Sequence, residues 1–228
     1  MAAEKLKAWS FSRWNQYEGC PQKVKFTAIM KMKEPSSPAL ERGTELHALC
    51  EKYLKAGERI PKELKPIEVQ LKDLRKRGAI AEAEFAFRKD WSATRWNDWA
   101  EAWIRIKADV IIPPVADAEV PTVEVHDFKT GKVREGASEY MLQLELYALA
   151  GLLTYPTAAQ VKTSLIFVDH GVVIEHEKIF TQKDVKGLKK QWEVRSKKML
   201  ADTIFKPKPG NACRFCFFAK SRGGPCVF

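Results

Sequence analysis

Apolar and polar residues follow helical spacing in the first part of the chain and strand spacing after it. Residues 10–32, 38–55 and 66–78 are predicted to be helical, and Gly19-Cys20-Pro21 interrupts the first. The second carries an apolar stripe, whereas the third is polar enough to be expected on the outside. Residues 80–87, 103–112, 122–129, 161–168 and 172–180 have the patterns of strands. Two further helices are predicted at residues 139–153 and 181–201, the last capped by Thr181. This order predicts an α/β fold in which one mixed sheet of about five strands is flanked by helices.

Two segments show neither spacing. The Trp-rich residues 89–100 are predicted to form a loop or turn, and the chain from Phe205 onward is rich in Pro, Gly and Cys. No internal repeat, low-complexity tract or linker separates the elements. We therefore expect residues 1–228 to form a single domain, with a helical N-terminal part (1–78), an α/β core (79–201) and a Cys-rich tail (202–228) that packs back on the N-terminal part.

Composition narrows the class of protein. The 228 residues are 45% hydrophobic and 30% charged, which argues against wholesale disorder. No apolar run approaches the roughly 18 residues that span a bilayer, and the first residues lack the apolar centre of a signal peptide. An intracellular, cytoplasmic protein without a membrane partner is expected. The net charge of +10 favours polyanions, chiefly nucleic acid, and some of the seven tryptophans could stack on bases, although most are expected in the core.

Candidate chemistry begins at the central strand. Asp127 and Lys129 are two residues apart on a strand, so their side chains project from the same face near its end. A carboxylate there can hold a divalent cation, and the ammonium can orient water or neutralise developing charge. A solvated ion pair would look the same. Asp109 lies near the end of the preceding strand, where two carboxylates could share one cation. Glu84 could add a third, although Glu82 is predicted on the same face.

Two helices add polar side chains. His47 lies among apolar residues, four residues before Glu51, and can be either a core histidine or a ligand for a transition ion. Gln143 and Tyr147 are also four apart, so they share one helix face. An amide and a phenol can grip a base or a phosphate oxygen, but an ordinary amphipathic helix fits as well.

The five cysteines form two groups. Cys50 has apolar neighbours, which predicts a core position. Cys213 and Cys216 form a C-x-x-C in the tail, Cys226 follows, and Cys20 at the helix break is the candidate fourth ligand. Four thiolates suit either a [4Fe–4S] cluster or structural zinc, and a metal would explain how an aperiodic tail stays ordered.

The order and spacing of these segments resemble the RecB-type branch of the PD-(D/E)XK nuclease superfamily over nearly the whole chain. The segments that carry the resemblance are SFSRWNQYEGCP, RGTELH with its histidine, KADVII with the first aspartate, VHDFKTGK with the D-x-K core, and QLELY, which resembles the Q-x-x-x-Y motif of exonuclease members. The C-terminal cysteines resemble the iron–sulfur staple of AddB and CRISPR-adaptation nucleases.

The resemblance implies a restriction-endonuclease-like core that binds Mg²⁺ or Mn²⁺. Asp109, Asp127, Lys129, Gln143 and Tyr147 would then be catalytic, with Lys129 positioning the attacking water and the last two holding the DNA strand. The implied metal ligands are His47, Asp109, Asp127, the backbone carbonyl of Phe128 and, for a third acidic position, Glu84. The implied ligands of a structural [4Fe–4S] cluster are Cys20, Cys213, Cys216 and Cys226.

We therefore expect a metal-dependent DNase, an exonuclease on single strands or DNA ends, acting in recombination, repair or phage DNA metabolism. Viral or mobile-element origin and a protein partner or homo-oligomer are compatible with this expectation. The competing hypothesis is a non-catalytic DNA-binding scaffold of a recombination or CRISPR-type complex. A regulator whose zinc-bound tail binds DNA is a third.

Overall fold

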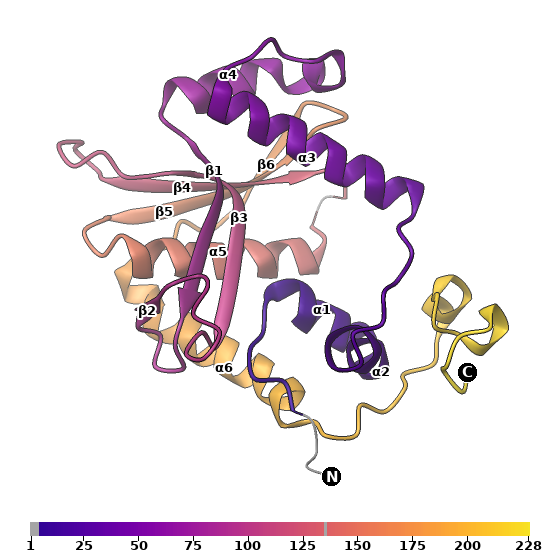
Figure 1. The fold of residues 1–228 in the computed structure, drawn as a ribbon. Helices are drawn as coiled ribbons and strands as arrows, with labels where there is room; N and C mark the ends of the chain where they lie inside the picture. Colours follow the sequence, from indigo (N-terminus) through magenta and orange to yellow (C-terminus); the bar gives the residue numbers. More distant parts are fainter. Residues whose placement is uncertain (1–4, 135) are drawn as a thin grey trace. The chain divides into compact units, whose positions relative to one another are not determined.

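The computed structural model describes residues 5–134 and 136–228 (Figure 1). The chain divides into two compact units, one of residues 38–190 and one that joins residues 1–37 to residues 191–228. The expectation of a single domain stays a prediction. No helix in the described residues is long and apolar enough to cross a membrane.

The larger unit is built on one mixed sheet, which confirms the predicted α/β fold class. Its six strands run in the order β2-β1-β3-β4-β5-β6, with β4 and β5 parallel and the other neighbours antiparallel. The strands are β1 (Ile80–Phe87), β2 (Ala93–Thr94), β3 (Ile104–Ile112), β4 (Thr122–Lys129), β5 (Gln160–Phe167) and β6 (Val172–Glu175).

Two details of the sheet differ from the expectation. The additional strand, β2, is a two-residue pairing inside the Trp-rich segment expected to be a loop, and such a short strand leaves no periodic pattern. Strand β6 ends at Glu175 rather than at residue 180, and an isolated bridge, Val161–Phe180, continues the pairing further along the chain.

Helices cover both faces of the sheet in Figure 1, with α3 and α4 on one side and α5 on the other. Their bounds are α3 (Pro38–Ala56), α4 (Glu68–Lys76) and α5 (Ser138–Thr154), and α6 (Val185–Ala201) starts in this unit. Helix α4 begins at Glu68, two residues later than expected, because Pro66 lies in a 3₁₀ helix (Lys62–Ile67) and proline cannot donate the backbone hydrogen bond of a helix interior.

The core beneath α3 and α4 is continuous with the sheet. Buried side chains of both helices pack with residues such as Val110, Phe128 and Ile166 from three strands. On the opposite face α5 approaches closely, since a Cβ on Gly151 would lie 3.4 Å from Val123 and Val161. Burial of this order drives the folding of the unit and holds both helices firmly against the strands.

Strands β3 and β4 pair over only a short stretch. Their register is Val110 with His126, Ile111 with Val125, and Ile112 with Glu124, whereas β3 pairs with β1 over nearly its whole length. The sheet therefore forks after the pair of Val110 and His126, and Figure 1 shows β1 and β3 turning away from β4 and β5.

The smaller unit contains α1 (Phe11–Gly19), α2 (Pro21–Val24), a π-helical turn (Lys25–Ile29), the second part of α6 and two 3₁₀ turns (Asn211–Phe215 and Lys220–Arg222). Ser10 caps α1, since its Oγ accepts a hydrogen bond from the backbone N–H of Arg13 at 3.3 Å. Buried rings of Trp9, Trp14 and Trp192 contact one another in its core.

The Cys-rich tail contacts the N-terminal helices within this unit. Tyr17 donates a hydrogen bond to Asp202 Oδ2 at 2.6 Å, and Lys208 Nζ donates one to the carbonyl of Glu18 at 2.7 Å. The first helix and the start of the tail are therefore held together by side-chain contacts as well as by the core.

Candidate active site

Two carboxylates lie where the sheet forks. Asp109 on β3 and Asp127 on β4 are the residues next to the pair of Val110 and His126, at the point where the strands separate. Asp109 Oδ2 accepts a hydrogen bond from the backbone N–H of Phe128 at 2.7 Å. A side chain thus satisfies a strand amide that its neighbouring strand no longer reaches.

His47 reaches the fork from α3. Its Nδ1 lies 3.3 Å from Asp109 Oδ1, and its ring meets the ring of Phe128 edge-on. Burial by itself would lower the pKa of His47, but the hydrogen bond and charge of Asp109, with the charge of Asp127, outweigh it and raise that pKa. Helix α3 is close to the loop after β4, because a Cβ on Gly43 would lie 3.2 Å from Thr130 Oγ1.

Lys129, Asp127, Gln143 and Tyr147 form one hydrogen-bonded network. Lys129 Nζ lies 2.6 Å from Asp127 Oδ2 and donates to Gln143 Oε1 at 2.9 Å. Gln143 Nε2 and Tyr147 Oη are 3.1 and 3.0 Å from Asp127 Oδ1, and 2.7 Å from each other. Tyr147 Oη also lies 3.0 Å from the carbonyl of Lys107. The spacing of four residues on α5 therefore brings an amide and a phenol to the same carboxylate.

The network holds a charge in an unfavourable place. Asp127 is 3% exposed, and its pKa is raised by burial and then by the nearby charge of Asp109, against the lowering effect of Lys129. The pKa of Tyr147 is also raised, by burial and by the charge of Asp127, which keeps its hydroxyl protonated as a donor. Two carboxylates with one nearby ammonium form an arrangement that a further cation would stabilise.

The loop after β4 is fixed by a second set of contacts. Asp169 accepts hydrogen bonds from the backbone N–H of Gly131 at 2.6 Å and from Arg42 Nη1 at 3.1 Å. The guanidinium of Arg42 lowers the pKa of Asp169 and, together with the Gly131 hydrogen bond, outweighs burial, which alone would raise that pKa. Gly131 has φ +83°, a conformation that glycine adopts without strain. The end of β4 is thereby tied to α3 and to the turn before β6.

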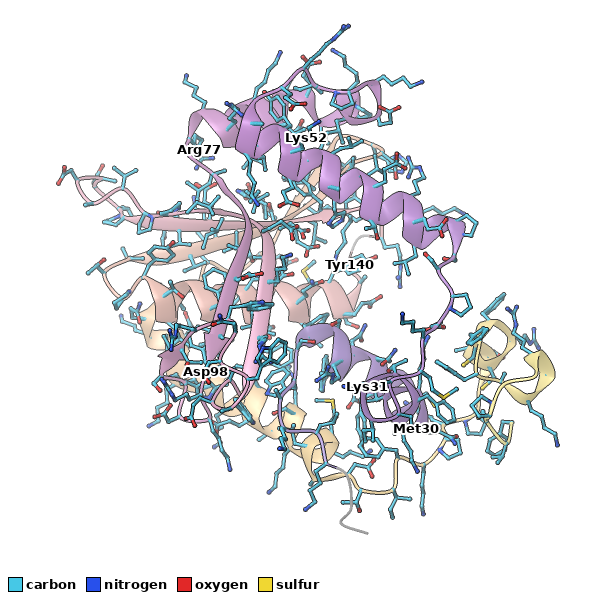
Figure 2. All side chains as sticks on the ribbon, viewed as in Figure 1. Met30, Lys31, Lys52, Arg77, Asp98 and Tyr140 are labelled. Carbon is cyan, nitrogen blue, oxygen red and sulfur yellow. The ribbon has the colours of Figure 1, made fainter. Side chains whose placement is uncertain are left out.

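A pocket of about 600 Å³ opens over these residues. It is lined by residues of α3, the end of β4 and Tyr140 of α5, which is labelled in Figure 2. Lys129 Nζ lies 4.7 Å from the centre of the Tyr140 ring. The lining residues that bear carboxylates, imidazole or ammonium groups are His47, Glu51, Glu82, Asp109 and Lys129.

Glu82, rather than Glu84, lines the pocket. Glu84 is exposed and stands opposite Lys107, whereas Glu82 is half-buried and forms an ion pair with Lys107. Glu82 has φ +57°, which is uncommon for a residue other than glycine, although burial along β1 alternates regularly through it. Strand alternation alone could not separate these two glutamates, and a residue in this conformation leaves no mark in the sequence.

The family follows from sequence. The sequence model of the PD-(D/E)XK nuclease superfamily matches residues 8–110 and 104–221. The chain belongs to the PD-(D/E)XK nuclease superfamily. A comparison with curated proteins finds no match.

Two solved structures have a fold similar to that of this chain. The crystal structure of SSO0001 has a TM-score of 0.51 at 17% identity, covering 94% of this chain and 85% of that chain. A provisionally assigned exonuclease from Eubacterium rectale has a TM-score of 0.57 at 11% identity, covering 97% and 89%. At these identities the similarity shows the fold.

Superfamily members generally use divalent metals such as Mg²⁺ or Mn²⁺. The oxygen donors of Asp109 and Asp127 suit such hard cations. Among the described residues, Asp127 Oδ2 has the Lys129 ammonium beside it at 2.6 Å and no other polar partner. Throughout residues 5–134 and 136–228, no three His, Cys, Asp or Glu side chains are grouped closely enough to hold a metal. The fork thus supplies suitable donors, while Asp127 is turned toward Lys129, Gln143 and Tyr147.

The backbone N–H of Phe128 donates a hydrogen bond to Asp109, and Phe128 also lines the pocket.

Two further residues that the sequence patterns did not single out are Tyr140 and Asp169. Tyr140 lies three residues before Gln143, so helical spacing could have included it with Gln143 and Tyr147.

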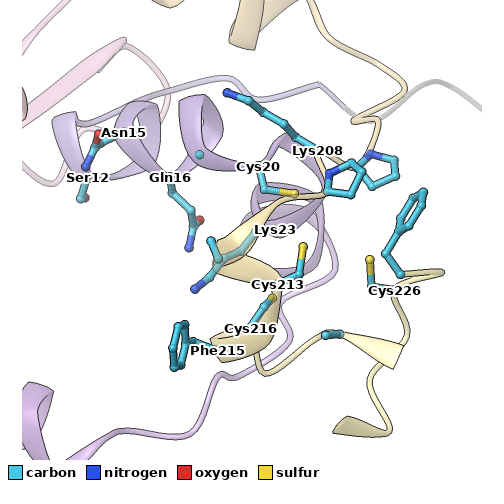
Figure 3. A pocket seen from close by; sticks show the side chains of 16 residues that line it. Ser12, Asn15, Gln16, Cys20, Lys23, Lys208, Cys213, Phe215, Cys216 and Cys226 are labelled. Carbon is cyan, nitrogen blue, oxygen red and sulfur yellow. The ribbon is translucent and has the colours of Figure 1, made fainter. Parts of the chain in front are cut away.

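A second pocket, of about 490 Å³, lies within the smaller unit (Figure 3). Four of the five cysteines line it, namely Cys20, Cys213, Cys216 and Cys226. The backbone N–H of Gly210 donates to Cys213 Sγ at 3.4 Å, and Cys226 Sγ lies 3.3 Å from Gln22 Oε1. Cys50 is buried in the core of the larger unit, and burial raises the pKa of its thiol to about 12, so it stays a neutral apolar residue.

Proposed function

We propose that this superfamily member is a metal-dependent DNase of the RecB-like type that hydrolyses phosphodiester bonds. The observation that carries the proposal is the meeting of Asp109, Asp127 and Lys129 at the fork, where Gln143 and Tyr147 fix Asp127 and Gln143 also fixes Lys129. A non-catalytic protein would have no use for a buried carboxylate, that of Asp127, placed beside the half-buried carboxylate of Asp109, whose charge disfavours it.

His47, Asp109, Asp127 and the carbonyl of Phe128 would hold Mg²⁺ or Mn²⁺. The bound cation would polarise the phosphate and lower the pKa of a bound water. Lys129 projects into the pocket, where its ammonium orients the attacking water and stabilises negative charge on the phosphate. Gln143 and Tyr147 hold Asp127 in one rotamer, and Tyr140 limits the movement of Lys129.

The proposal predicts that Lys129→Ala abolishes cleavage. The assay uses end-labelled linear and closed circular single-stranded DNA with Mg²⁺, with Mn²⁺ and with a chelator. Loss of DNA only when metal and Lys129 are both present supports the proposal. If Lys129→Ala cuts as fast as the unmodified protein, the catalytic centre is elsewhere. If nothing is cut although DNA is bound, the protein is the non-catalytic scaffold instead.

We further propose that the enzyme is an exonuclease on single strands or DNA ends. The Q-x-x-x-Y spacing of Gln143 and Tyr147 and the name of the Eubacterium rectale protein support this choice. The same assay tests it, because an exonuclease removes linear DNA and leaves circles intact. Cleavage of circles would keep the chemistry and refute the exonuclease assignment.

For the cysteine pocket we propose a structural [4Fe–4S] cluster, with zinc as the alternative. The support is the donor set, because Cys20, Cys213, Cys216 and Cys226 all line one pocket that joins the N-terminal helices to the tail. Soft thiolates suit either metal, and a bound group would order the tail. Anaerobic purification followed by absorption spectra and elemental analysis separates the two. A brown, iron-containing protein that loses colour and stability with Cys213→Ser supports the cluster, whereas stoichiometric zinc in a colourless protein refutes it.

A further inference from the structure

The Trp-rich segment between β1 and β3 has no part in the site at the fork, yet it presents an aromatic ring to solvent. Trp99 is 74% exposed, whereas Trp91 in the same segment is buried. The guanidinium of Arg105 lies 3.9 Å from the centre of the Trp99 ring and covers one of its faces. The high exposure leaves the other face open to water, which is unfavourable for so large an apolar surface.

The exposed ring is held in place. Arg105 Nε donates to the carbonyl of Trp96 at 2.9 Å, and its Nη2 donates to the carbonyl of Asp98 at 3.3 Å. The carboxylate of Asp98, labelled in Figure 2, accepts hydrogen bonds from Thr94 Oγ1 at 2.8 Å and from the backbone N–H of Glu101 at 3.1 Å. Arg105 therefore fixes both the loop and the ring it covers, so little conformational entropy remains to be lost when a ligand stacks on Trp99.

A row of side chains on β3 connects this ring to the fork. Arg105, Lys107 and Asp109 alternate along the strand and are exposed or half-buried, while the residues between them are buried. From Arg105 to Asp109 the strand extends about 13 Å, which is roughly the length of four stacked nucleotides. The Trp99 ring therefore lies within reach of a short DNA segment whose phosphate occupies the fork.

The row of Arg105, Lys107 and Asp109 carries too little positive charge to bind DNA through phosphate contacts alone. Lys107 is paired with Glu82 and stands opposite Glu84, so its charge is largely compensated. Residues 88–107 as a whole contain five basic and three acidic residues, which is compatible with a polyanion but gives only weak attraction. Stacking on an open aromatic face is the stronger contribution available here.

We propose that Trp99, backed by Arg105, is a stacking platform for one base of single-stranded DNA, about four nucleotides from the phosphate at the fork. The inference rests on the proposed nuclease function for its substrate and deepens it by naming where the strand lies. The exposed sequence neighbours of Trp99 include Arg95, Asn97 and Glu101, and this polar setting favours a polar ligand over the apolar surface of a protein partner.

The first test measures binding without cleavage. Fluorescence anisotropy with labelled 12-nucleotide oligothymidine in chelator compares the unmodified protein with Trp99→Ala, Trp99→Tyr and Val69→Ala, the last replacing an exposed residue of α4. Trp99→Ala should weaken binding about 5- to 150-fold, the range expected for one base–aromatic stack. Trp99→Tyr should stay close to the unmodified protein. The slope of log Kd against log salt should be the same in all four, because no phosphate contact is removed.

The second test places the platform relative to the fork. With Mg²⁺, Trp99→Ala should lower kcat/KM on 12-nucleotide strands but not on dinucleotides, which are too short to reach both positions. Equal binding of 12-nucleotide strands by Trp99→Ala and Val69→Ala would refute the platform, as would absence of any binding by the unmodified protein or a reduced salt slope. If the unmodified protein binds but never cuts, while Trp99→Ala still weakens binding, the platform stands and the nuclease function fails.

Discussion

The hydroxyl of Tyr147 tests whether the network around Asp127 serves the site or only the fold. Tyr147→Phe keeps the buried ring and removes one oxygen, which lies 3.0 Å from Asp127 Oδ1, 3.0 Å from the carbonyl of Lys107 and 2.7 Å from Gln143 Nε2. After the change, Asp127 Oδ1 keeps only the hydrogen bond from Gln143 among those that the described residues provide.

The expected loss of stability in Tyr147→Phe follows from the burial of Tyr147. Tyr147 is 4% exposed, so its lost hydrogen bonds cannot be replaced by bulk water. Removing one partner of a buried, charged acceptor costs about 1–3 kcal/mol of unfolding free energy. For a chain of this length that corresponds to a fall in Tm of about 2–12 °C. Because Asp127 would also lose part of what fixes its rotamer, kcat/KM should fall about 10- to 100-fold, as it does when residues that orient a metal ligand are removed.

Tyr155→Phe is the matched control. Tyr155 lies at the end of the same helix, and its hydroxyl forms no hydrogen bond with the described residues. Thermal melts and single-strand cleavage at saturating Mg²⁺ are measured for both variants. A loss of stability in Tyr147→Phe with kcat/KM within twofold of the unmodified protein would refute the reasoning, because the hydroxyl would then stabilise the fold without orienting Asp127.

Two further outcomes follow from the structure. Glu82→Gln should lower cleavage about tenfold or more because Glu82 lines the pocket, while Glu84→Gln should stay within about twofold; equal rates for the two variants would remove Glu82 from the site. The pKa of Glu124 is lowered from 4.5 to about 2. The hydrogen bond with His126 is the largest cause, burial opposes it by raising the pKa, and Arg77 lowers the pKa further. This carboxylate therefore stabilises the protein above about pH 4.5 and loses that effect as the pH falls toward 2. In urea denaturation, the stability lost in Glu124→Gln should shrink from about 1–3 kcal/mol at pH 6 to near zero at pH 2, and a loss independent of pH would contradict the assignment.

Strand and helix spacing were sufficient for the parts of the site that depend on local geometry. Asp127 and Lys129 share a face because they are two residues apart on a strand. Gln143 and Tyr147 share a face because they are four residues apart on a helix. Whether those two faces meet depends on how α5 packs against β4, which no local pattern encodes.

The remainder depended on departures from regular structure. Glu82 and Glu84 share one face of an ideal strand, and which of them lines the pocket depends on the register of β1 against β3, in which Glu84 stands opposite Lys107. The fork itself depends on a strand pairing that stops after three residues, and β2 is too short to have a period. The 3₁₀ turn at Pro66 was foreseeable, because proline inside a helical pattern moves the start of the regular helix.

The hydrogen bond from the Phe128 amide to Asp109 also makes that amide a spectroscopic reporter. An amide inside a strand ladder exchanges its proton with solvent when the ladder opens, but this one depends on the rotamer of one carboxylate. Rotation of Asp109 toward an added cation would release the amide without unfolding the sheet. Site-resolved hydrogen exchange at Phe128, with and without Mg²⁺, therefore reads the state of Asp109 in the absence of any nucleic acid.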